Sequence, residues 1–309
     1  MMGIISSFYR KSFVCRYDKE VGIPYYSHTD FEGLNQERFS FINSKGIEIQ
    51  CFYYYYDNYR KDKVILFCHG IGPGHTAYMA EINELAKRGY KILALDYCGC
   101  GESKGKILNS LNEPTRDVND LLDYLKLDVP VVLVGHSLGG YTALNISNLR
   151  KDINKAVVLS GFLSISSLAL GILKSKFIVS RILSYERKQE PEYFKLDNIN
   201  YLKTTDNDIF FIQSSDDGIV SYNIALGLVM DIDNPHIKKL KIENRKHNPN
   251  YTDAAIAYMN EVFAKYNTLI KEKKIKTDED KINYFKDVSL AKLVEQDQDL
   301  FNQIAEFIG

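Results

Sequence analysis

The sequence predicts an α/β protein built on a mostly parallel sheet, with helices on both faces and one helical insertion. Short runs rich in Val, Ile and Leu alternate with stretches whose apolar residues recur at helical spacing. This alternation favours parallel strands joined by helices. One of the runs also ends in Gly-His-Ser-Leu-Gly at residues 135–139, and a helical pattern begins directly afterwards.

The composition predicts a globular protein with a sizeable core. The chain has 309 residues, of which 45% are hydrophobic and 26% are charged. Its formal net charge of −1 provides no basic surface for phosphates, so nucleic acid and anionic membranes are not expected partners. The five cysteines are an odd number without the spacing of a disulfide framework, which predicts reduced thiols and a cytoplasmic protein.

Residues 1–36 are expected to form a lead-in that packs on the body of the protein. Arg10 and Lys11 end the apolar run at the N-terminus too early for a signal peptide, so neither secretion nor a stable membrane anchor is expected. The sheet should then begin with two strands, at residues 37–42 and 47–56, which are joined by a tight turn.

The next strand, residues 63–69, runs into a glycine-rich loop. A free backbone N–H in such a loop can stabilise an oxyanion. We expect the N–H of Ile71 to do so together with the N–H of Leu138, and we interpret His69 as a structural residue that braces the loop. A helix that ends at Gly89 should follow.

The strand at residues 90–97 leads into a loop that contains Cys98 and Cys100. The glycine spacing in this loop matches neither a dinucleotide-binding loop nor a phosphate-binding loop. No second pair of Cys or His with ligand spacing accompanies the two cysteines, so neither a metal nor a cofactor is expected. A helix that begins near Pro114 then leads to the central strand.

That central strand begins at Val131 and delivers Ser137 on a sharp turn. Gly135 and Gly139 have no side chains, which lets the strand and the following helix approach each other closely. The helix that begins at Leu138 directs its free N–H groups and the positive end of its dipole toward the same place. Ser137 is therefore the predicted nucleophile; the alternative is an ordinary glycine-rich turn.

After a strand at residues 155–161, the alternation of strands and helices breaks. Residues 162–207 are dense in apolar residues at helical spacing, and we predict that they form a cap that lines an apolar pocket. Lys174 and Lys176 interrupt the pattern, so a membrane span is not expected. The alternative is a helical excursion that does not contact substrate.

The strand at residues 209–213 ends beside two acids, Asp216 and Asp217. A carboxylate here would orient a catalytic histidine and stabilise its imidazolium. We favour Asp217, because the Asp-Gly-Ile-Val that it begins has the Asp-x-x-Val register usual at such a site. Asp216 stays open, and capping of the turn is the alternative for either acid.

His247 follows the last predicted strand, residues 237–242, and completes the order Ser, Asp, His. His28, His75 and His236 lie in no comparable setting. The core therefore comprises residues 37–161 and 208–309, within which residues 250–295 are a predicted helical insertion. The chain should end in an amphipathic helix that docks on the sheet.

In this order, the motifs resemble the α/β-hydrolase superfamily, and within it the capped group of monoglyceride lipases, cinnamoyl esterases and serine aminopeptidases. The resemblance rests on His69-Gly70-Ile71-Gly72, Asp96-x-x-Gly99-x-Gly101-x-Ser103, Gly135-His136-Ser137-Leu138-Gly139, Asp217 and His247. It implies an eight-stranded sheet whose second strand is antiparallel, and hydrolysis of an ester through an acyl-serine. Cys98 and Cys100 replace the Arg and His of many relatives, which leaves the substrate class open.

The expected activity is that of a carboxylesterase or a monoacylglycerol-type lipase acting on a small ester with an apolar acyl group. His247 would deprotonate Ser137, and Asp217 would hold the imidazole. In relatives that open epoxides, Asp takes the place of Ser on the turn between the strand and the helix. A peptidase or amidase is an alternative, with Glu186, Glu190 and Glu192 as candidates to bind a substrate amine. A non-catalytic scaffold is the other alternative.

Overall fold

The computed structural model describes residues 13–173 and 175–309 of the chain. Predictions that concern residues 1–12, among them the absence of a signal peptide, lie outside the described residues, and so does Lys174 of the predicted cap. No helix of the described part is both long enough and apolar enough to cross a membrane.

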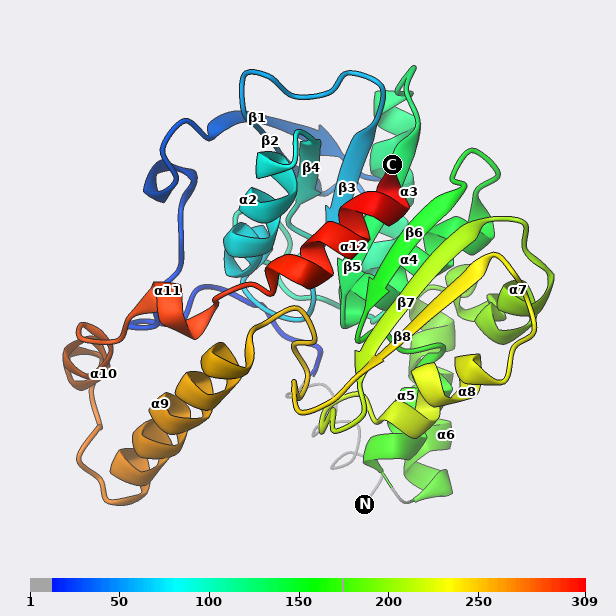
Figure 1. Cartoon of the computed structure of the whole chain (residues 1–309). Coiled ribbons are helices and arrows are strands. Elements are labelled where there is room, and N and C mark those ends of the chain that lie inside the picture. The colour runs from blue at the N-terminus through cyan, green and yellow to red at the C-terminus, as the bar shows by residue number, and fades with distance from the viewer. Residues whose placement is uncertain (1–12, 174) are drawn as a thin grey trace.

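One sheet of eight strands organises the described residues, in the order β1-β2-β4-β3-β5-β6-β7-β8 (Figure 1). The strands are β1 (Asn35–Ile42), β2 (Glu48–Tyr55), β3 (Val64–Cys68), β4 (Lys91–Leu95), β5 (Val131–His136), β6 (Lys155–Leu159), β7 (Asp208–Ser214) and β8 (Ile237–Ile242). Only β2 runs against its neighbours, which confirms the expected sheet. β1 begins slightly before residue 37, because Asn35 and Gln36 pair with Tyr55 and Tyr54.

Helices cover both faces of the sheet, as predicted. Helices α2 (Met79–Lys87) and α12 (Gln298–Ile308) pack on one face, and α3 (Glu113–Leu125) and α4 (Leu138–Leu149) pack on the other. Alternate side chains of each central strand enter the two resulting clusters. A strand that is buried on both faces must be apolar at every position, which explains the continuous runs in the sequence. The last helix docks on the sheet through Leu300 and Ile304, as expected.

The segment between β6 and β7 is helical. It contains α5 (Ile165–Ile172), α6 (Lys176–Gln189), a short 3₁₀ helix (Tyr193–Lys195) and α7 (Asn198–Thr204). Figure 1 shows α5 and α6 beyond the carboxyl ends of the parallel strands. Leu168 of α5 and Leu202 of α7 join the core cluster on the α3 and α4 face. A helical segment therefore occupies the position of the predicted cap, and its role toward substrate stays a prediction.

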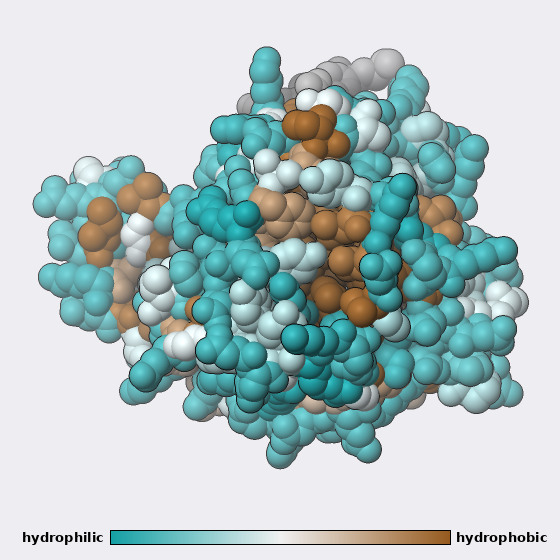
Figure 2. All heavy atoms as spheres, turned by 90° about the horizontal axis from the view of Figure 1, so that it is seen from above, coloured by the Kyte–Doolittle hydropathy of each residue, from teal (hydrophilic) through white to brown (hydrophobic). Residues whose placement is uncertain are grey.

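A second helical segment, which we call the lobe, follows β8. It consists of α9 (Asp253–Lys271), α10 (Asp278–Phe285) and α11 (Leu290–Leu293), and it forms the projection on the left of Figures 1 and 2. Its buried residues Val262, Phe285 and Leu293 form an apolar cluster of their own. An isolated antiparallel bridge between Tyr251 and Gln296 closes its base. We call residues 250–252 and 295–297 the neck.

Candidate active site

Ser137 stands on a strained turn between β5 and α4. Its φ of 56° and ψ of −117° lie in a region that residues other than glycine rarely adopt. A Cβ atom on Gly135 would lie 2.1 Å from the carbonyl oxygen of Gly139, and one on Gly139 would lie 1.9 Å from that of Cys68. This confirms that the two glycines let strand and helix approach closely. The backbone packing around Ser137 thus leaves the turn little freedom to shift.

Asp217 and His247 meet at the ends of β7 and β8. The Nδ1 atom of His247 lies 3.0 and 2.9 Å from the two carboxylate oxygens of Asp217. The N–H groups of Ile219 and Val220 also donate to this carboxylate, each at 2.9 Å. Burial by itself would raise the pKa of Asp217, but the hydrogen bonds from His247 and from the two N–H groups lower it below its usual value. Asp217 is therefore a buried carboxylate that orients the imidazole and leaves Nε2 available.

Asp216, the alternative acid, has different partners. Its carboxylate lies 3.0 Å from the Nζ atom of Lys246 and accepts a hydrogen bond of 2.6 Å from the hydroxyl of Ser214. The structure therefore brings Asp217, and not Asp216, to His247.

The loop after β3, which we call the oxyanion loop, lies against the turn that carries Ser137. A Cβ atom on Gly70 would lie 3.3 Å from the Cβ atom of Ser137 and 3.2 Å from the carbonyl oxygen of His136. Within the described part of the chain, the N–H groups of Ile71 and Leu138 donate to no acceptor. These two N–H groups, which the sequence predicts as oxyanion donors, thus remain available for an oxyanion.

His69 braces the oxyanion loop, as the sequence analysis interprets it. Its Nδ1 atom lies 2.7 Å from the carbonyl oxygen of Gly70, and its Nε2 atom accepts from the N–H of Tyr97 at 3.3 Å. The imidazole stacks on the ring of Tyr97 with centroids 3.9 Å apart. Burial lowers the pKa of His69 to about 4, so the ring is neutral and Nδ1–H is the donor.

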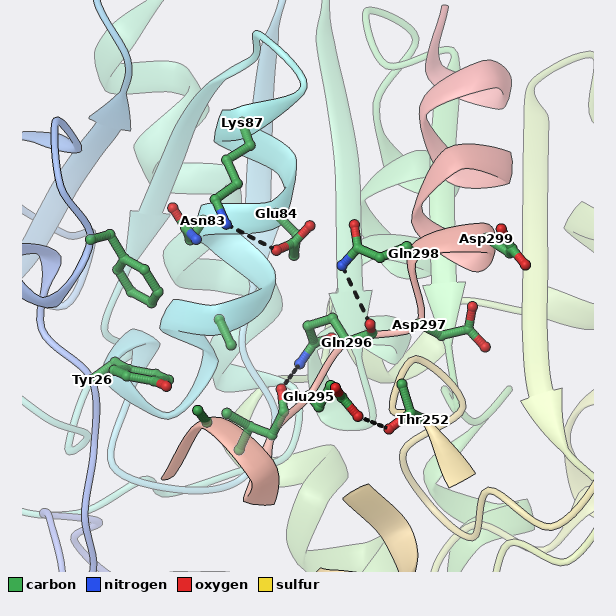
Figure 3. A pocket seen from close by; sticks show the side chains of 14 residues that line it. Tyr26, Asn83, Glu84, Lys87, Thr252, Glu295, Gln296, Asp297, Gln298 and Asp299 are labelled. Carbon is green, nitrogen blue, oxygen red and sulfur yellow. Dashed lines mark hydrogen bonds and ion pairs between the residues drawn. The ribbon is translucent and has the colours of Figure 1, made fainter. Parts of the chain in front are cut away.

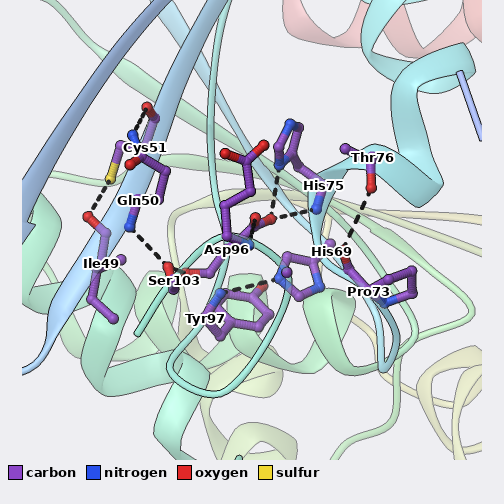
Figure 4. A network of polar contacts seen from close by, with 12 residues as sticks. Ile49, Gln50, Cys51, His69, Pro73, His75, Thr76, Asp96, Tyr97 and Ser103 are labelled. Carbon is purple, nitrogen blue, oxygen red and sulfur yellow. Dashed lines mark hydrogen bonds and ion pairs between the residues drawn. The ribbon is translucent and has the colours of Figure 1, made fainter. Parts of the chain in front are cut away.

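A buried histidine–aspartate pair that was not predicted from the sequence supports the same loop (Figure 4). The N–H and the Nδ1 atom of His75 lie 2.7 and 2.8 Å from Oδ1 of Asp96, and the N–H of Glu102 donates to Oδ2 at 2.8 Å. Burial alone would raise the pKa of Asp96, but His75 and the N–H of Glu102 lower it. Both side chains are almost fully buried, so the pair joins the loops after β3 and β4 and contacts no substrate. A histidine followed by a helix carries no sequence signal for such a partner.

Two of the three acids that were candidates to bind a substrate amine, Glu186 and Glu190, have structural partners, whereas Glu192 is exposed. The carboxylate of Glu186 accepts from the hydroxyl of Ser110 at 2.5 Å and from the N–H of Leu111 at 3.1 Å, and Glu190 pairs with Arg116. Glu186 is fully buried, and Glu190 nearly so. These two acids therefore attach the predicted cap to α3 and the loop before it.

The thiols of Cys98 and Cys100 are free and buried, and burial raises the pKa of both. Among the described residues, no group of three or more His, Cys, Asp or Glu side chains could hold a metal ion.

A separate pocket of about 480 Å³ lies between α2, α11 and the neck (Figure 3). Its lining includes Lys87, Glu84, Thr252 and Glu295, and none of the three candidate catalytic residues. Lys87 pairs with Glu84 at 3.4 Å, and the hydroxyl of Thr252 donates to Glu295 at 2.6 Å. The pocket is thus a polar hollow at the base of the lobe, separate from the candidate active site.

Known proteins that are similar to this chain bear the names of hydrolases. The family model described as serine aminopeptidase, S33, matches residues 59–192. An epoxide hydrolase from Caballeronia sordidicola is 38% identical over 96 residues, which cover 30% of this chain and 29% of that protein. The sn-1-specific diacylglycerol lipase ABHD11 from Mus musculus is 33% identical over 96 residues, which cover 31% of each. The chain thus matches less than half the length of these relatives.

The fold is shared with solved hydrolase structures. The esterase Pf2001 from Pyrococcus furiosus superimposes with a TM-score of 0.58 over 84% of this chain and 97% of its own, at 17% identity. At this identity the likeness shows a common fold and nothing about substrate.

Proposed function

Because the chain belongs to the α/β-hydrolase superfamily, we propose that it is a serine hydrolase that cleaves carboxylic esters through an acyl-serine intermediate. The observation that carries the proposal is the contact of 2.9 Å between Nδ1 of His247 and the buried carboxylate of Asp217, at the same edge of the sheet as the strained turn of Ser137. A histidine held in this way directs Nδ1 to the carboxylate, so that in the neutral ring Nε2 can accept the proton of a serine hydroxyl.

The reaction proceeds in two acyl-transfer steps. His247 takes the proton of Ser137 as Oγ attacks the ester carbonyl carbon, and the oxyanion that forms accepts hydrogen bonds from the N–H groups of Ile71 and Leu138. The imidazolium then protonates the departing alkoxide. Water attacks the acyl-serine with the same histidine as base, and collapse of the second tetrahedral intermediate releases the acid and restores Ser137.

An apolar acyl group suits the surface of the predicted cap. Leu170 and Ile172 of α5 and Phe177 of α6 are 47, 49 and 58% exposed. Large apolar side chains that are exposed favour contact with an apolar ligand. We therefore propose a carboxylesterase or a monoacylglycerol-type lipase. The cytoplasmic location expected from the cysteines stays a prediction.

The name of one relative suggests epoxide hydrolysis, but a serine nucleophile does not suit that reaction. A carboxylate nucleophile opens an epoxide to give an ester, which water then cleaves. Ser137 would give an alkyl ether, which a triad of this kind does not hydrolyse.

The experiment that tests the proposal measures hydrolysis of p-nitrophenyl esters from acetate to laurate. Ser137→Ala should lower kcat by about three orders of magnitude or more. Ser160→Ala is the matched control, because Ser160 lies after the neighbouring strand and its buried hydroxyl has no hydrogen-bond partner among the described atoms. Equal turnover by Ser137→Ala and wild type would refute the proposal.

A peptidase or amidase is the second candidate, and the match to the serine aminopeptidase model favours it. The partners of Glu186 and Glu190 argue against these acids as amine-binding groups. Turnover of aminoacyl p-nitroanilides faster than of the esters would favour the peptidase. If a fluorophosphonate probe leaves Ser137 of the folded protein unlabelled, the third alternative, a non-catalytic scaffold protein, would be favoured.

A further inference from the structure

His136, which precedes the candidate nucleophile, connects two parts of the candidate site. Its Nε2 atom lies 2.8 Å from the backbone carbonyl oxygen of His247, and its Nδ1 atom lies 3.0 Å from the hydroxyl of Tyr78. A carbonyl oxygen can only accept a hydrogen bond, so Nε2 carries the hydrogen and Nδ1 accepts from Tyr78. Burial, together with the nearby His247, lowers the pKa of His136 to about 3, so the ring is neutral, as this arrangement requires.

The hydroxyl of Tyr78 also lies against the oxyanion loop. A Cβ atom on Gly70 would lie only 2.4 Å from this hydroxyl, so the phenol is in close contact with the backbone of this loop. The ring of Tyr78 packs on Phe67 of β3, with centroids 5.4 Å apart, and on His136, with centroids 5.6 Å apart. One phenol therefore contacts the loop that contains Ile71 and the residue next to Ser137.

The loop that carries His247 lies at an edge of the sheet, where side chains at the end of β7 bond to it: Ser214 accepts from the N–H of Arg245 and Asp216 from that of Lys246. The loop follows the edge strand β8, and its backbone has a positive φ at Asn244 and Lys246. Loops at sheet edges move more than the strands that they join. A displacement of a catalytic group by about 1 Å can cost about 100-fold in rate. A hydrogen bond from His136 to the carbonyl of His247 therefore restrains a loop whose displacement would slow the reaction.

We propose that Tyr78 and His136 are positioning residues that hold the His247 loop and the oxyanion loop at fixed places relative to Ser137. This inference rests on the proposed function. Neither side chain serves as acid, base or nucleophile. Tyr78 acts through its contacts with Gly70 and His136, and His136 acts through the backbone of His247.

The test compares Tyr78→Phe, which removes one hydroxyl, with Tyr56→Phe as the matched control. The hydroxyl of Tyr56 donates to Asn83 of the neighbouring helix α2 at 2.8 Å, away from the triad. Rates are expressed per serine labelled by a fluorophosphonate, so unfolded molecules do not count. Tyr78→Phe should lower kcat between about tenfold and about 100-fold with KM nearly unchanged, because geometry and not substrate affinity is lost. Tyr56→Phe should keep the wild-type kcat.

The position of His136 provides a rescue experiment. His136→Gln keeps an N–H donor for the carbonyl of His247 and an acceptor for Tyr78, whereas His136→Leu keeps neither. Gln should therefore retain at least about tenfold more activity than Leu. Equal loss in both variants would overturn the proposal, and so would a Tyr78→Phe variant that loses thermal stability but keeps kcat.

A readout without substrate separates this inference from the proposed function. The Nδ1–H proton of His247, which is bonded to Asp217, should give a downfield NMR resonance that exchanges slowly with water in the wild type. It should exchange faster in Tyr78→Phe but not in Tyr56→Phe. If the wild type neither reacts with the fluorophosphonate nor hydrolyses esters, the proposed function fails, and the exchange rates decide the positioning role. Equal exchange in all three proteins overturns it.

Discussion

The turn that carries Ser137 and the loop that carries His247 lie at the same edge of the sheet, but different interactions hold them. Strand β5 before Ser137 is buried along its whole length, and backbone atoms of Gly139 and Cys68 pack against the turn. Strand β8 before His247 is at the sheet edge and only partly buried. The candidate nucleophile is thus positioned by close backbone packing, and His247 by hydrogen bonds from distant side chains.

The loop that carries His247, which we call the histidine loop, leads directly into the base of the lobe. Arg245 contacts Asp253 of α9 at 2.7 Å and Asp297 of the neck at 3.1 Å, and so joins the loop to both the lobe and the neck. On the inner side, the amide of Asn250 donates to buried Glu81 of α2 at 3.0 Å. The lobe therefore stabilises the histidine loop through polar contacts, which mutations and pH can weaken one at a time.

The largest effect should come from the acid that orients the histidine. Asp217→Asn should lower kcat by about 10⁴-fold, because an amide group favours the wrong tautomer of His247. Asp216→Asn is the matched control on the adjacent residue: it keeps an oxygen that can accept from the hydroxyl of Ser214 and the N–H of Lys246. It loses the half-exposed ion pair with the Lys246 side chain and should change kcat by less than about threefold. Steady-state kinetics with p-nitrophenyl esters measures both. Losses of similar size would mean that the pairing of His247 with Asp217 alone does not position the histidine.

The second effect concerns the neck and depends on pH. Burial raises the pKa of Glu81 to about 7, whereas an unfolded chain would release this proton near the usual value of 4.5. The folded state binds more protons between these values, so the stability from this group falls as the pH rises from about 4.5 to about 7. The full change is about 3 kcal/mol.

Urea unfolding at several pH values tests this second prediction. Glu81→Gln cannot titrate, so its stability relative to the wild type should increase by about 3 kcal/mol across that window. The hydrogen bond from Asn250 can persist with the amide oxygen of Gln. If the difference in stability between Glu81→Gln and the wild type does not vary with pH, Glu81 does not titrate in this range.

The smallest effect concerns the glycines around the turn that carries Ser137. Gly139→Ala should destabilise the protein by about 2 kcal/mol and reduce labelling of Ser137, because the added methyl would overlap the carbonyl of Cys68 and force α4 to shift. Gly218→Ala is the control, since nothing lies within 4 Å of a Cβ atom there, and its stability should stay within about 0.5 kcal/mol of the wild type. Full stability and labelling in Gly139→Ala would contradict the role of close packing at this turn.

Much of the fold could be predicted because its signals are local. Continuous runs of β-branched residues mark the strands that are buried on both faces, and β8 was predicted at Ile237–Ile242, where the structure has it. The start of β1 was less accurate, because pairing with β2 extends it beyond its apolar core. The lobe and the terminal helix could also be predicted from helical periodicity.

The turn that carries Ser137 can be predicted from local sequence, since a strand, two glycines and a helix are consecutive and their steric fit follows from neighbouring residues. The choice between Asp216 and Asp217, which have the same chemistry and adjacent positions, required the folded structure. The folded structure also revealed the structural role of Glu186 and the contacts of His136 with Tyr78 and His247. The physical reason is that a hydrogen bond between side chains depends on where distant segments meet, and no local pattern encodes that position.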